Sequence, residues 1–285
     1  MYVVMGATGH VGEAVANALL ARGEEVTVLT RHPERATAWQ NKGASVAKAD
    51  VEDLASLKAA FQSGRRAFLL NPPADPAGDT DKTERRTIAN ILAALDGSGL
   101  EKVVAASTYG ARAGEGIGDL STLWEMEEGL RRQPIPAAIN RGAYYMTNWL
   151  GLVDTVRQSG KLPCMFPSDT VIPMVAPRDL GQAAAARLVS STDDVGIRYV
   201  EGPERYTPQD VADAFAQALD REVMVDVAPR DQWESIFKEL GFSDEAARAF
   251  TKMTAASLDE GFDKPQSPLR GRVTLTEFVV ATIAR

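Results

Sequence analysis

Three evenly spaced glycines near the start of the chain have the residue types needed to bind the phosphates of a dinucleotide. Gly6, Gly9 and Gly12 follow the apolar run of residues 2–5 and precede residues 13–21, whose apolar side chains recur on one helical face. In a strand–turn–helix unit the first glycine permits a tight turn, the second lets the backbone approach a pyrophosphate, and the third brings the helix close to the strand. The helix N-terminus adds N–H groups for the phosphates. The spacing therefore predicts a dinucleotide site that comprises Gly6, Thr8, Gly9, His10, Val11 and Gly12.

The end of the second expected strand carries an arginine where NAD-binding units carry an acid. Residues 25–30 fit a strand, and Arg31 follows, with His32 and Arg35 close behind. An Asp or Glu about 20 residues after the glycines normally bonds the ribose 2′-hydroxyl of NAD, whereas a guanidinium can hold a 2′-phosphate in a bidentate manner. Arg31 could also simply begin a solvated turn before Pro33. Its position nevertheless predicts NADP(H) rather than NAD as the cofactor.

Further candidate residues stand at the ends of three more expected strands. These strands cover residues 44–49, 66–70 and 102–106. The carboxyl ends of parallel strands meet at one edge of a sheet, so the residues after them collect around the cofactor. Asp50 is either a partner of the adenine amino group or the N-cap of the next helix. The cofactor-binding residues predicted at these ends are Asp50, Val51, Asn71, Pro72 and Ser107.

The strands alternate with amphipathic segments, of which residues 79–97 are the clearest helix. The alternation predicts an α/β fold with a Rossmann-type, doubly wound parallel sheet and right-handed crossovers. After residue 150 the chain becomes richer in proline, with short extended pieces between isolated helices. We therefore expect an NADP-binding Rossmann domain over residues 1–150, to which residues 178–192 return. A smaller, partly discontinuous α+β domain over residues 151–285 would cover the substrate.

The composition argues against several classes of protein. Of the 285 residues, 45% are hydrophobic and 25% are charged, which is ordinary for a globular chain. A net charge of −8 argues against nucleic acid or an anionic membrane as a partner, and no apolar run approaches the roughly 18 residues of a membrane span. The single cysteine, Cys164, and the lack of an evident signal peptide favour a cytoplasmic location. Two histidines without a Cys/His cluster predict no metal site.

Several motifs, taken in order, resemble the NmrA-like branch of the atypical short-chain dehydrogenases/reductases. The G-x-x-G-x-x-G turn and Arg31 at the end of the second strand are the first two. The later ones are Arg141-Gly142-Ala143-Tyr144-Tyr145-Met146 with Asn148-Trp149, Asp179-Leu180-Gly181, Gly202-Pro203-Glu204 and Arg270-Gly271-Arg272. That branch includes NADPH-dependent quinone reductases, triphenylmethane-dye and azo-dye reductases, and non-catalytic NADP sensors. The resemblance implies that Arg141, Gly142 and Ala143 lie against the nicotinamide half of the cofactor, and that the aromatic run after them walls the substrate pocket.

The chain departs from the wider superfamily in its catalytic residues. Many of those reductases use a Tyr-x-x-x-Lys pair, in which the lysine lowers the pKa of the tyrosine so that it passes a proton to a carbonyl oxygen. Tyr109, Tyr144 and Tyr145 are each followed four residues later by a residue other than lysine. Glu125 stands where many NmrA-like enzymes carry a lysine. The catalytic residues therefore stay unknown, and ketone reduction and sugar epimerisation are disfavoured.

The predicted substrate-binding residues are mostly aromatic. They are Tyr109, Tyr144, Tyr145, Met146, Asn148 and Trp149, which would form a flat cleft for a ring. We expect about half of the aromatic residues to face the pocket and the others to pack in the core. Asn148 would orient a polar group of the substrate or cap a helix. Ser107, which has no adjacent histidine or acid to make it a nucleophile, would bond the nicotinamide ribose or a substrate oxygen.

Other residues have predicted roles outside the chemistry. His10 would fill the phosphate loop, with its ring near the cofactor. Glu125, Glu127 and Glu128 would lie on a solvated helix face, where only Glu125 has a further role, since a carboxylate beside a pocket favours a cationic substrate. Cys164 would be a packed thiol.

These residues together predict an NADPH-dependent oxidoreductase that transfers hydride to an easily reduced aromatic acceptor, either a quinone or an azo or triphenylmethane dye. Such acceptors take hydride readily, so the protein has mainly to hold them against the nicotinamide. The alternative is a non-catalytic, NADP-sensing regulatory protein of the NmrA type, which would bind a partner protein without turnover. The expected partners of the enzyme are a small aromatic substrate and a second copy of the chain in a homodimer, with neither nucleic acid nor membrane.

Overall fold

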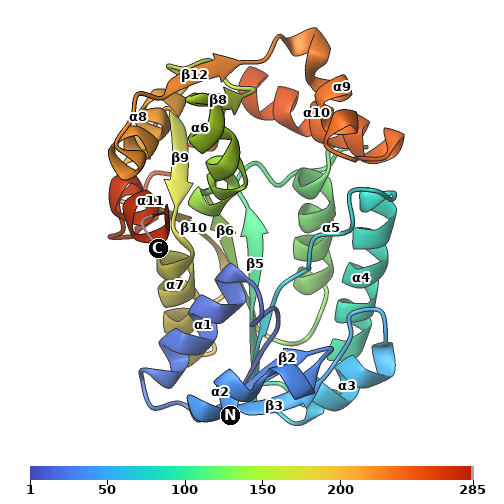
Figure 1. Ribbon diagram of the computed structural model, residues 1–285. Coiled ribbons are helices and arrows are strands. Elements are labelled where there is room, and N and C mark those ends of the chain that lie inside the picture. Colours follow the sequence, from blue (N-terminus) through green and yellow to red (C-terminus); the bar gives the residue numbers. More distant parts are fainter. Residues whose placement is uncertain (284–285) are drawn as a thin grey trace.

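The computed structural model describes residues 1–283, and its centre is one all-parallel sheet of eight strands (Figure 1). The strand order is β13-β10-β6-β5-β4-β1-β2-β3. The chain therefore runs outward from β1 in one direction and then outward from β4 in the other, which confirms the predicted doubly wound Rossmann-type sheet. The strands are β1 (Tyr2–Val4), β2 (Val26–Thr30), β3 (Ser45–Lys48), β4 (Arg66–Leu69), β5 (Lys102–Thr108), β6 (Ala137–Gly142), β10 (Gly196–Glu201) and β13 (Leu269–Arg270).

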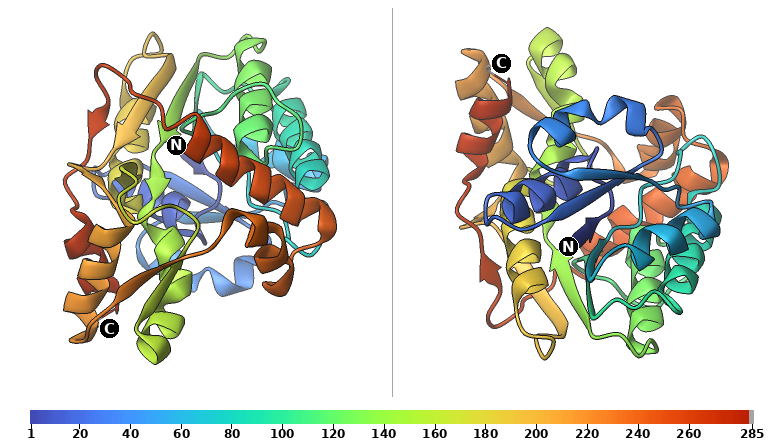
Figure 2. Two further views of the ribbon diagram at one scale, coloured as in Figure 1. Left: turned by 90° about the horizontal axis from the view of Figure 1, so that it is seen from above. Right: turned by 90° about the horizontal axis from the view of Figure 1, so that it is seen from below.

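Helices cover both faces of this sheet (Figure 2). One face carries α1 (His10–Leu20) and α7 (Pro177–Val189), which pack against each other; the other carries α3 (Leu54–Gln62), α4 (Thr80–Leu95) and α5 (Asp119–Arg131). Burial on both faces explains why the central strands are continuous apolar runs. The helix predicted over residues 79–97 is α4, and the carboxylate of Asp79 caps it by accepting a hydrogen bond from the Lys82 N–H.

The segments after residue 143 build a smaller cluster above the carboxyl edge of the sheet (Figure 1). It contains a three-stranded sheet in the order β11-β9-β7 and a parallel pair, β12 and β8. Its core residues include Trp149, Met174 and Phe215. The elements after residue 143 that lie outside the main sheet, apart from α7, are β7 (Tyr144–Tyr145), η2 (Met146–Leu152), α6 (Val153–Ser159), β8 (Lys161–Cys164), β9 (Ile172–Val175), β11 (Arg205–Tyr206), α8 (Pro208–Leu219), β12 (Met224–Val227), η3 (Arg230–Gln232), α9 (Trp233–Glu239), α10 (Asp244–Asp259) and α11 (Leu275–Ile283).

The C-terminal half also contributes two strands to the large sheet. β10 pairs with β6, and the two-residue β13 pairs with β10 at the edge. Neither was predicted as a strand of the large sheet. β13 has only two residues, too few for a periodicity, and the alternation of exposed and half-buried residues at the start of β10 is typical of a strand but does not show which sheet the strand joins. Two short segments between β2 and β3, η1 (Pro33–Arg35) and α2 (Thr37–Asn41), complete the described elements. No helix among residues 1–283 is long and apolar enough to cross a membrane.

An arm made of α9 and α10 reaches from the smaller cluster toward α4 and α5 (Figures 1 and 2). Ser243, which precedes α10, donates hydrogen bonds from its N–H to the Pro76 carbonyl at 2.9 Å and from its hydroxyl to the Gly78 carbonyl at 2.8 Å. Beyond α10, a carboxylate oxygen of Asp263 accepts a hydrogen bond from the Gly110 N–H at 2.7 Å. The arm is thus attached to the loops that follow β4 and β5.

Candidate functional site

A cavity of about 990 Å³ opens beside the carboxyl ends of β1, β2, β3 and β4. It lies where the strand order reverses, the position at which doubly wound sheets bind nucleotides. Its volume lies within the range of roughly 300–1,000 Å³ that is usual for cofactor and ligand sites. Six of the predicted cofactor residues line it: Gly6, Thr8, Arg31, Asp50, Val51 and Pro72.

The glycine turn at one end of this cavity has the backbone geometry that only glycine tolerates. Gly6 has a φ of +68°, and a Cβ on Gly12 would lie 2.3 Å from the Gly6 carbonyl carbon. Gly9 differs, because its φ of −110° is ordinary and a Cβ there would meet nothing closer than 3.6 Å. Gly9 is the N-cap of α1, and no side chain caps that helix. The N–H groups of its first turn are therefore available to an anion.

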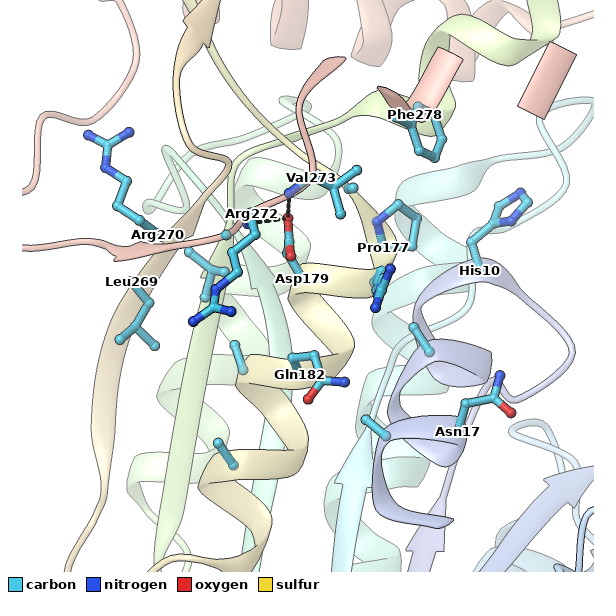
Figure 3. A pocket seen from close by; sticks show the side chains of 18 of the residues that line it. His10, Asn17, Pro177, Asp179, Gln182, Leu269, Arg270, Arg272, Val273 and Phe278 are labelled. Atoms are coloured by element: carbon cyan, nitrogen blue, oxygen red, sulfur yellow. Dashed lines mark hydrogen bonds between the residues drawn. The ribbon is translucent and has the colours of Figure 1, made fainter. Parts of the chain in front are cut away.

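The two residues that follow Gly9 point away from the cavity. Val11 is buried in the core on the sheet side of α1. The His10 ring lies on the outer side of α1, where it lines a separate groove (Figure 3). The ring lines this groove and not the cavity, and the cofactor contacts of His10 and Val11 stay a prediction.

The arginines that follow β2 present free guanidinium groups to the cavity. Arg31 and Arg35 both line it, and within residues 1–283 neither side chain makes a hydrogen bond or an ion pair. The turn that carries them is held locally, because the Thr30 hydroxyl oxygen accepts a hydrogen bond from the His32 N–H at 3.1 Å and Pro33 begins a 3₁₀ turn. Two unpaired guanidiniums at one strand end suit a phosphate dianion.

The structure distinguishes between the two roles considered for Asp50, helix N-cap and cofactor contact. Asp53, not Asp50, is the N-cap of α3, since its carboxylate accepts hydrogen bonds from the Ala55 and Ser56 N–H groups. Asp50 instead lines the cavity, and one of its carboxylate oxygens accepts from the Glu52 N–H at 3.0 Å. The N-cap alternative for Asp50 is therefore excluded, and the adenine contact stays a prediction.

The end of β4 continues the wall of the cavity. Pro72 lines it together with the loop that follows, up to Gly78. The amide oxygen of Asn71 accepts a hydrogen bond from the Thr87 hydroxyl at 2.6 Å, and Thr87 itself lines the cavity. This bond fixes the amide orientation at the strand end.

A buried polar network occupies the carboxyl ends of β5 and β6. The Glu127 carboxylate, from α5, accepts hydrogen bonds from the Ser107 hydroxyl at 2.5 Å and from Nε and Nη2 of Arg141, each at 2.8 Å. Burial opposes the charge of Arg141, but its hydrogen bonds to Glu127 outweigh this effect and raise the pKa of Arg141. Glu127 is only 1% exposed, so the expectation that it lies on a solvated face is wrong. The Ser107 and Arg141 side chains are engaged with a protein carboxylate, and Gly142 and Ala143 adjoin them through backbone.

Tyr109 belongs to the core rather than to an open cleft. It is 4% exposed, and its hydroxyl donates to the Glu201 carboxylate at 2.8 Å. Burial and this bond raise the pKa of Tyr109. Burial alone would raise the pKa of Glu201, but hydrogen bonds from Arg205 and Tyr109 lower it. Tyr109 is therefore one of the aromatic residues that pack in the core and do not face a pocket.

The aromatic run after β6 divides between core and surface. Met146 and Trp149 are buried in the smaller cluster, Tyr144 and Tyr145 are half-buried, and Asn148 is exposed. Burial raises the pKa of both tyrosines to about 12. Tyr145 packs so closely on β6 that a Cβ on Gly142 would lie 2.9 Å from its ring. Tyr144, Tyr145 and Asn148 are thus the members of this run with accessible surface.

Two neighbouring carboxyl groups, those of Glu84 on α4 and Asp119 at the start of α5, were not predicted from the sequence. Glu84 is 5% exposed, accepts hydrogen bonds from the Thr122 hydroxyl and the Ala74 N–H, and shares a hydrogen bond with Asp119. Burial and the nearby charge of Asp119 raise the pKa of Glu84 to about 8. No sequence signal pairs these acids, because they lie 35 residues apart on neighbouring helices.

Glu125, the one acid for which a substrate role was considered, is already paired. Its carboxylate oxygens accept hydrogen bonds from Nε of Arg85 at 3.0 and 3.1 Å. The pair is partly exposed at the surface between α4 and α5. The positive charge of Arg85 offsets that of Glu125, so the pair has little net charge with which to attract a cationic substrate.

The fold is that of a doubly wound α/β protein with a cavity where its strand order reverses, and comparison with known proteins gives its family. The NmrA-like family matches residues 2–279, so the chain belongs to that family. Quinone oxidoreductase 2 of Escherichia coli strain K12 is 24% identical over 282 residues, which cover 97% of this chain and 96% of that protein. A nitrogen metabolite regulation-like protein of Gibberella fujikuroi is 27% identical over 257 residues, covering 84% of this chain and 72% of that protein.

Solved structures agree on the fold. The Citrobacter sp. triphenylmethane reductase complexed with NADP(H) superposes with a TM-score of 0.82 at 18% identity, and the match covers 99% of both chains. At this identity the likeness concerns the fold alone.

Proposed function

We propose that this protein is an NADPH-dependent oxidoreductase that transfers hydride to an easily reduced aromatic acceptor, a quinone or an azo or triphenylmethane dye. The observation that carries the proposal is that the guanidiniums of Arg31 and Arg35 line the cavity at the end of β2 and are unpaired within residues 1–283. Its family relatives include a quinone oxidoreductase, and a triphenylmethane reductase solved with NADP(H) shares its fold. Residues 1–150 with 178–192 would hold the cofactor, and later segments would cover the acceptor.

The residues of the chain would hold the cofactor from three sides. The first-turn N–H groups of α1, with Gly6, Thr8 and Gly9, suit the pyrophosphate, and Arg31 suits the 2′-phosphate. When bound, NADPH supplies a hydride from C4 of its nicotinamide. The backbone of Gly142 and Ala143 would lie against the nicotinamide, and Tyr144, Tyr145 and Asn148 would hold the ring of the acceptor against it.

The side chains at the ends of β5 and β6 favour an acceptor that needs no dedicated proton donor. Ser107 and Arg141 are bound to Glu127, and Tyr109 is bound to Glu201 with a raised pKa. None of these three is poised to give up a proton at neutral pH. A quinone or cationic dye suits such a site, since its reduction is driven mainly by hydride transfer and water can supply any proton.

Stopped-flow absorbance tests this proposal. The purified protein is mixed with NADPH and a panel of quinones, azo dyes and triphenylmethane dyes, and the loss of NADPH absorbance is followed. We expect turnover with at least one acceptor and a strong preference for NADPH over NADH. Absence of turnover across the panel would count against the enzyme.

The second candidate is an NADP-sensing regulatory protein without turnover. The same engagement of Ser107, Tyr109 and Arg141 by buried carboxylates supports it, and so does the regulation-like relative from Gibberella fujikuroi. Calorimetric titration with NADP⁺ and NADPH, together with the acceptor panel, separates the two candidates, because equal affinity for the oxidised and reduced cofactor would favour the sensor. A sensor would bind the cofactor, turn over no acceptor and co-purify with a partner protein.

A further inference from the structure

A second large concavity lies on the opposite side of the glycine turn from the cofactor cavity. It encloses about 1500 Å³ and runs along the outer surface of α7 (Figure 3). One side is formed by α1, with His10 and Asn17, and the other by β13 and the segment after it, with Arg270 and Arg272. Phe278 of α11 closes one end. We refer to this concavity as the α7 groove.

The size and shape of the α7 groove suit an inserted segment of chain. Its volume exceeds the roughly 1,000 Å³ at the upper end of small-molecule sites. It follows α7, whose 13 residues span about 20 Å at 1.5 Å per residue. Four alanines line the groove beside the polar Asn17 and Gln182, and such small side chains permit a second helix to approach at the usual 8–10 Å. They are Ala14 and Ala18 of α1 and Ala183 and Ala186 of α7.

The polar lining of the groove indicates an acidic occupant. Arg178, near the start of α7, and Arg272, after β13, are exposed, and within residues 1–283 neither guanidinium has a hydrogen bond or a carboxylate within 4 Å. Four acids line the groove, and each has a partner. Asp194 pairs with Arg187 and Arg198, and Glu13 lies 3.8 Å from Lys42 Nζ. The Asp179 carboxylate accepts from the Arg272 and Val273 N–H groups, and that of Glu277 accepts from the Thr274 N–H. With five arginines and four acids, the lining carries one net positive charge on a chain with a net charge of −8, and Arg178 and Arg272 are the arginines without a partner within residues 1–283.

We propose that the α7 groove docks an acidic amphipathic helix of a partner protein. The apolar face of that helix would lie on the alanines, between Leu150 and Phe278 at one end and Leu269 at the other, and its carboxylates would reach Arg178 and Arg272. A second copy of the chain fits less well, because a concave surface cannot fill itself across a two-fold axis. This role goes beyond the proposed reductase activity, and it requires no turnover.

Peptide display tests the proposal without a known partner. Random peptides of about 16 residues on phage are selected against the full-length protein in the presence of NADPH, and enriched sequences are synthesised and titrated by fluorescence anisotropy. We expect acidic peptides with apolar residues at i, i+3, i+4 and i+7. Their Kd should rise at least tenfold in the Arg178→Glu/Arg272→Glu double variant and at higher salt.

A charge-matched control keeps the result specific. Arg157 and Arg248 are exposed on α6 and α10, outside the groove, and Arg157→Glu/Arg248→Glu should change the peptide Kd by less than about twofold. NADPH affinity, measured on all variants, reports that the fold is intact. The proposal fails if selection yields no acidic peptides, or if those selected bind the groove variant as tightly as the wild type. It also fails if Arg178→Glu/Arg272→Glu abolishes a dimer in sedimentation, which would assign the groove to a second copy.

Discussion

The prediction that tests the cofactor assignment most directly is replacement of Arg31 by alanine. Arg31 lines the cavity at the end of β2 and has no partner within residues 1–283, so its removal leaves no buried group unsatisfied and the fold should be unaffected. Hydrogen bonds to charged groups contribute roughly 1.5–3 kcal/mol, and the exposure of Arg31 favours the lower end of this range. Because each 1.4 kcal/mol corresponds to about tenfold in Kd, we expect NADPH to bind about tenfold more weakly.

The discriminating measurement is a comparison of two cofactors by fluorescence titration. NADH lacks the 2′-phosphate, so its Kd should change by less than about twofold in Arg31→Ala. Arg35 faces the same cavity, and the Arg31→Ala/Arg35→Ala double variant should weaken NADPH by about 100-fold. Arg132→Ala, an exposed arginine outside the cavity, is the matched control. An equal loss for NADH and NADPH would refute the 2′-phosphate role of Arg31.

Three further perturbations follow from the packing. Gly12→Ala should destabilise the protein by at least about 2 kcal/mol in urea unfolding, because its Cβ would overlap the backbone of the turn, whereas Gly9→Ala should fold normally and weaken only cofactor binding. Glu127→Ala should cost about 3 kcal/mol of stability, because it removes the carboxylate that accepts two hydrogen bonds from the half-buried Arg141 guanidinium and leaves only that of Asp263 at 4.0 Å. Burial and a neighbouring carboxylate raise the pKa of Glu84 to about 8, so the folded state binds an extra proton between about pH 4.5 and 8. Stability should therefore fall as pH rises through this window, and Glu84→Gln should flatten the dependence.

Each of these results has a contrary outcome. Equal stability of Gly12→Ala and Gly9→Ala would contradict the close contact at the turn. A neutral Glu127→Ala would mean that the Arg141 guanidinium finds water. For Glu84, unfolding midpoints measured at pH 5, 6.5 and 8 that decline equally in wild type and Glu84→Gln would assign the pH dependence to other groups.

Much of the cofactor half of the site could be predicted from local sequence. The turn at Gly6–Gly12 depends on glycine conformations and contacts within a few residues, and the strands before and after it are recognisable from their apolar runs. Arg31, Asp50 and Pro72 are placed by simple topology, because each follows a strand of one parallel sheet and such strand ends meet at one edge. Local patterns therefore sufficed to predict the fold class and the side of the sheet on which the cavity opens.

The acceptor half depended on contacts that no local pattern encodes. Glu127 has charged neighbours on its helix, which predicted a solvated side chain, yet α5 turns it inward onto Ser107 of β5 and Arg141 of β6. Tyr109 stands at a strand end like a ligand-binding residue, but Glu201 from the C-terminal half draws it into the core.

The sequence alone thus predicted the doubly wound sheet and the glycine turn, because these rest on backbone geometry and on periodicities within single elements. The family was indicated by the order of its motifs, and the family match over residues 2–279 confirms it. Only the tertiary structure decided which side chains at the strand ends are accessible and which are hydrogen-bonded to buried carboxylates. It also showed the α7 groove, whose walls come from residues more than 250 positions apart in the chain. Which distant side chains meet depends on how whole helices and strands pack together, and this cannot be read from the residue types in any one segment.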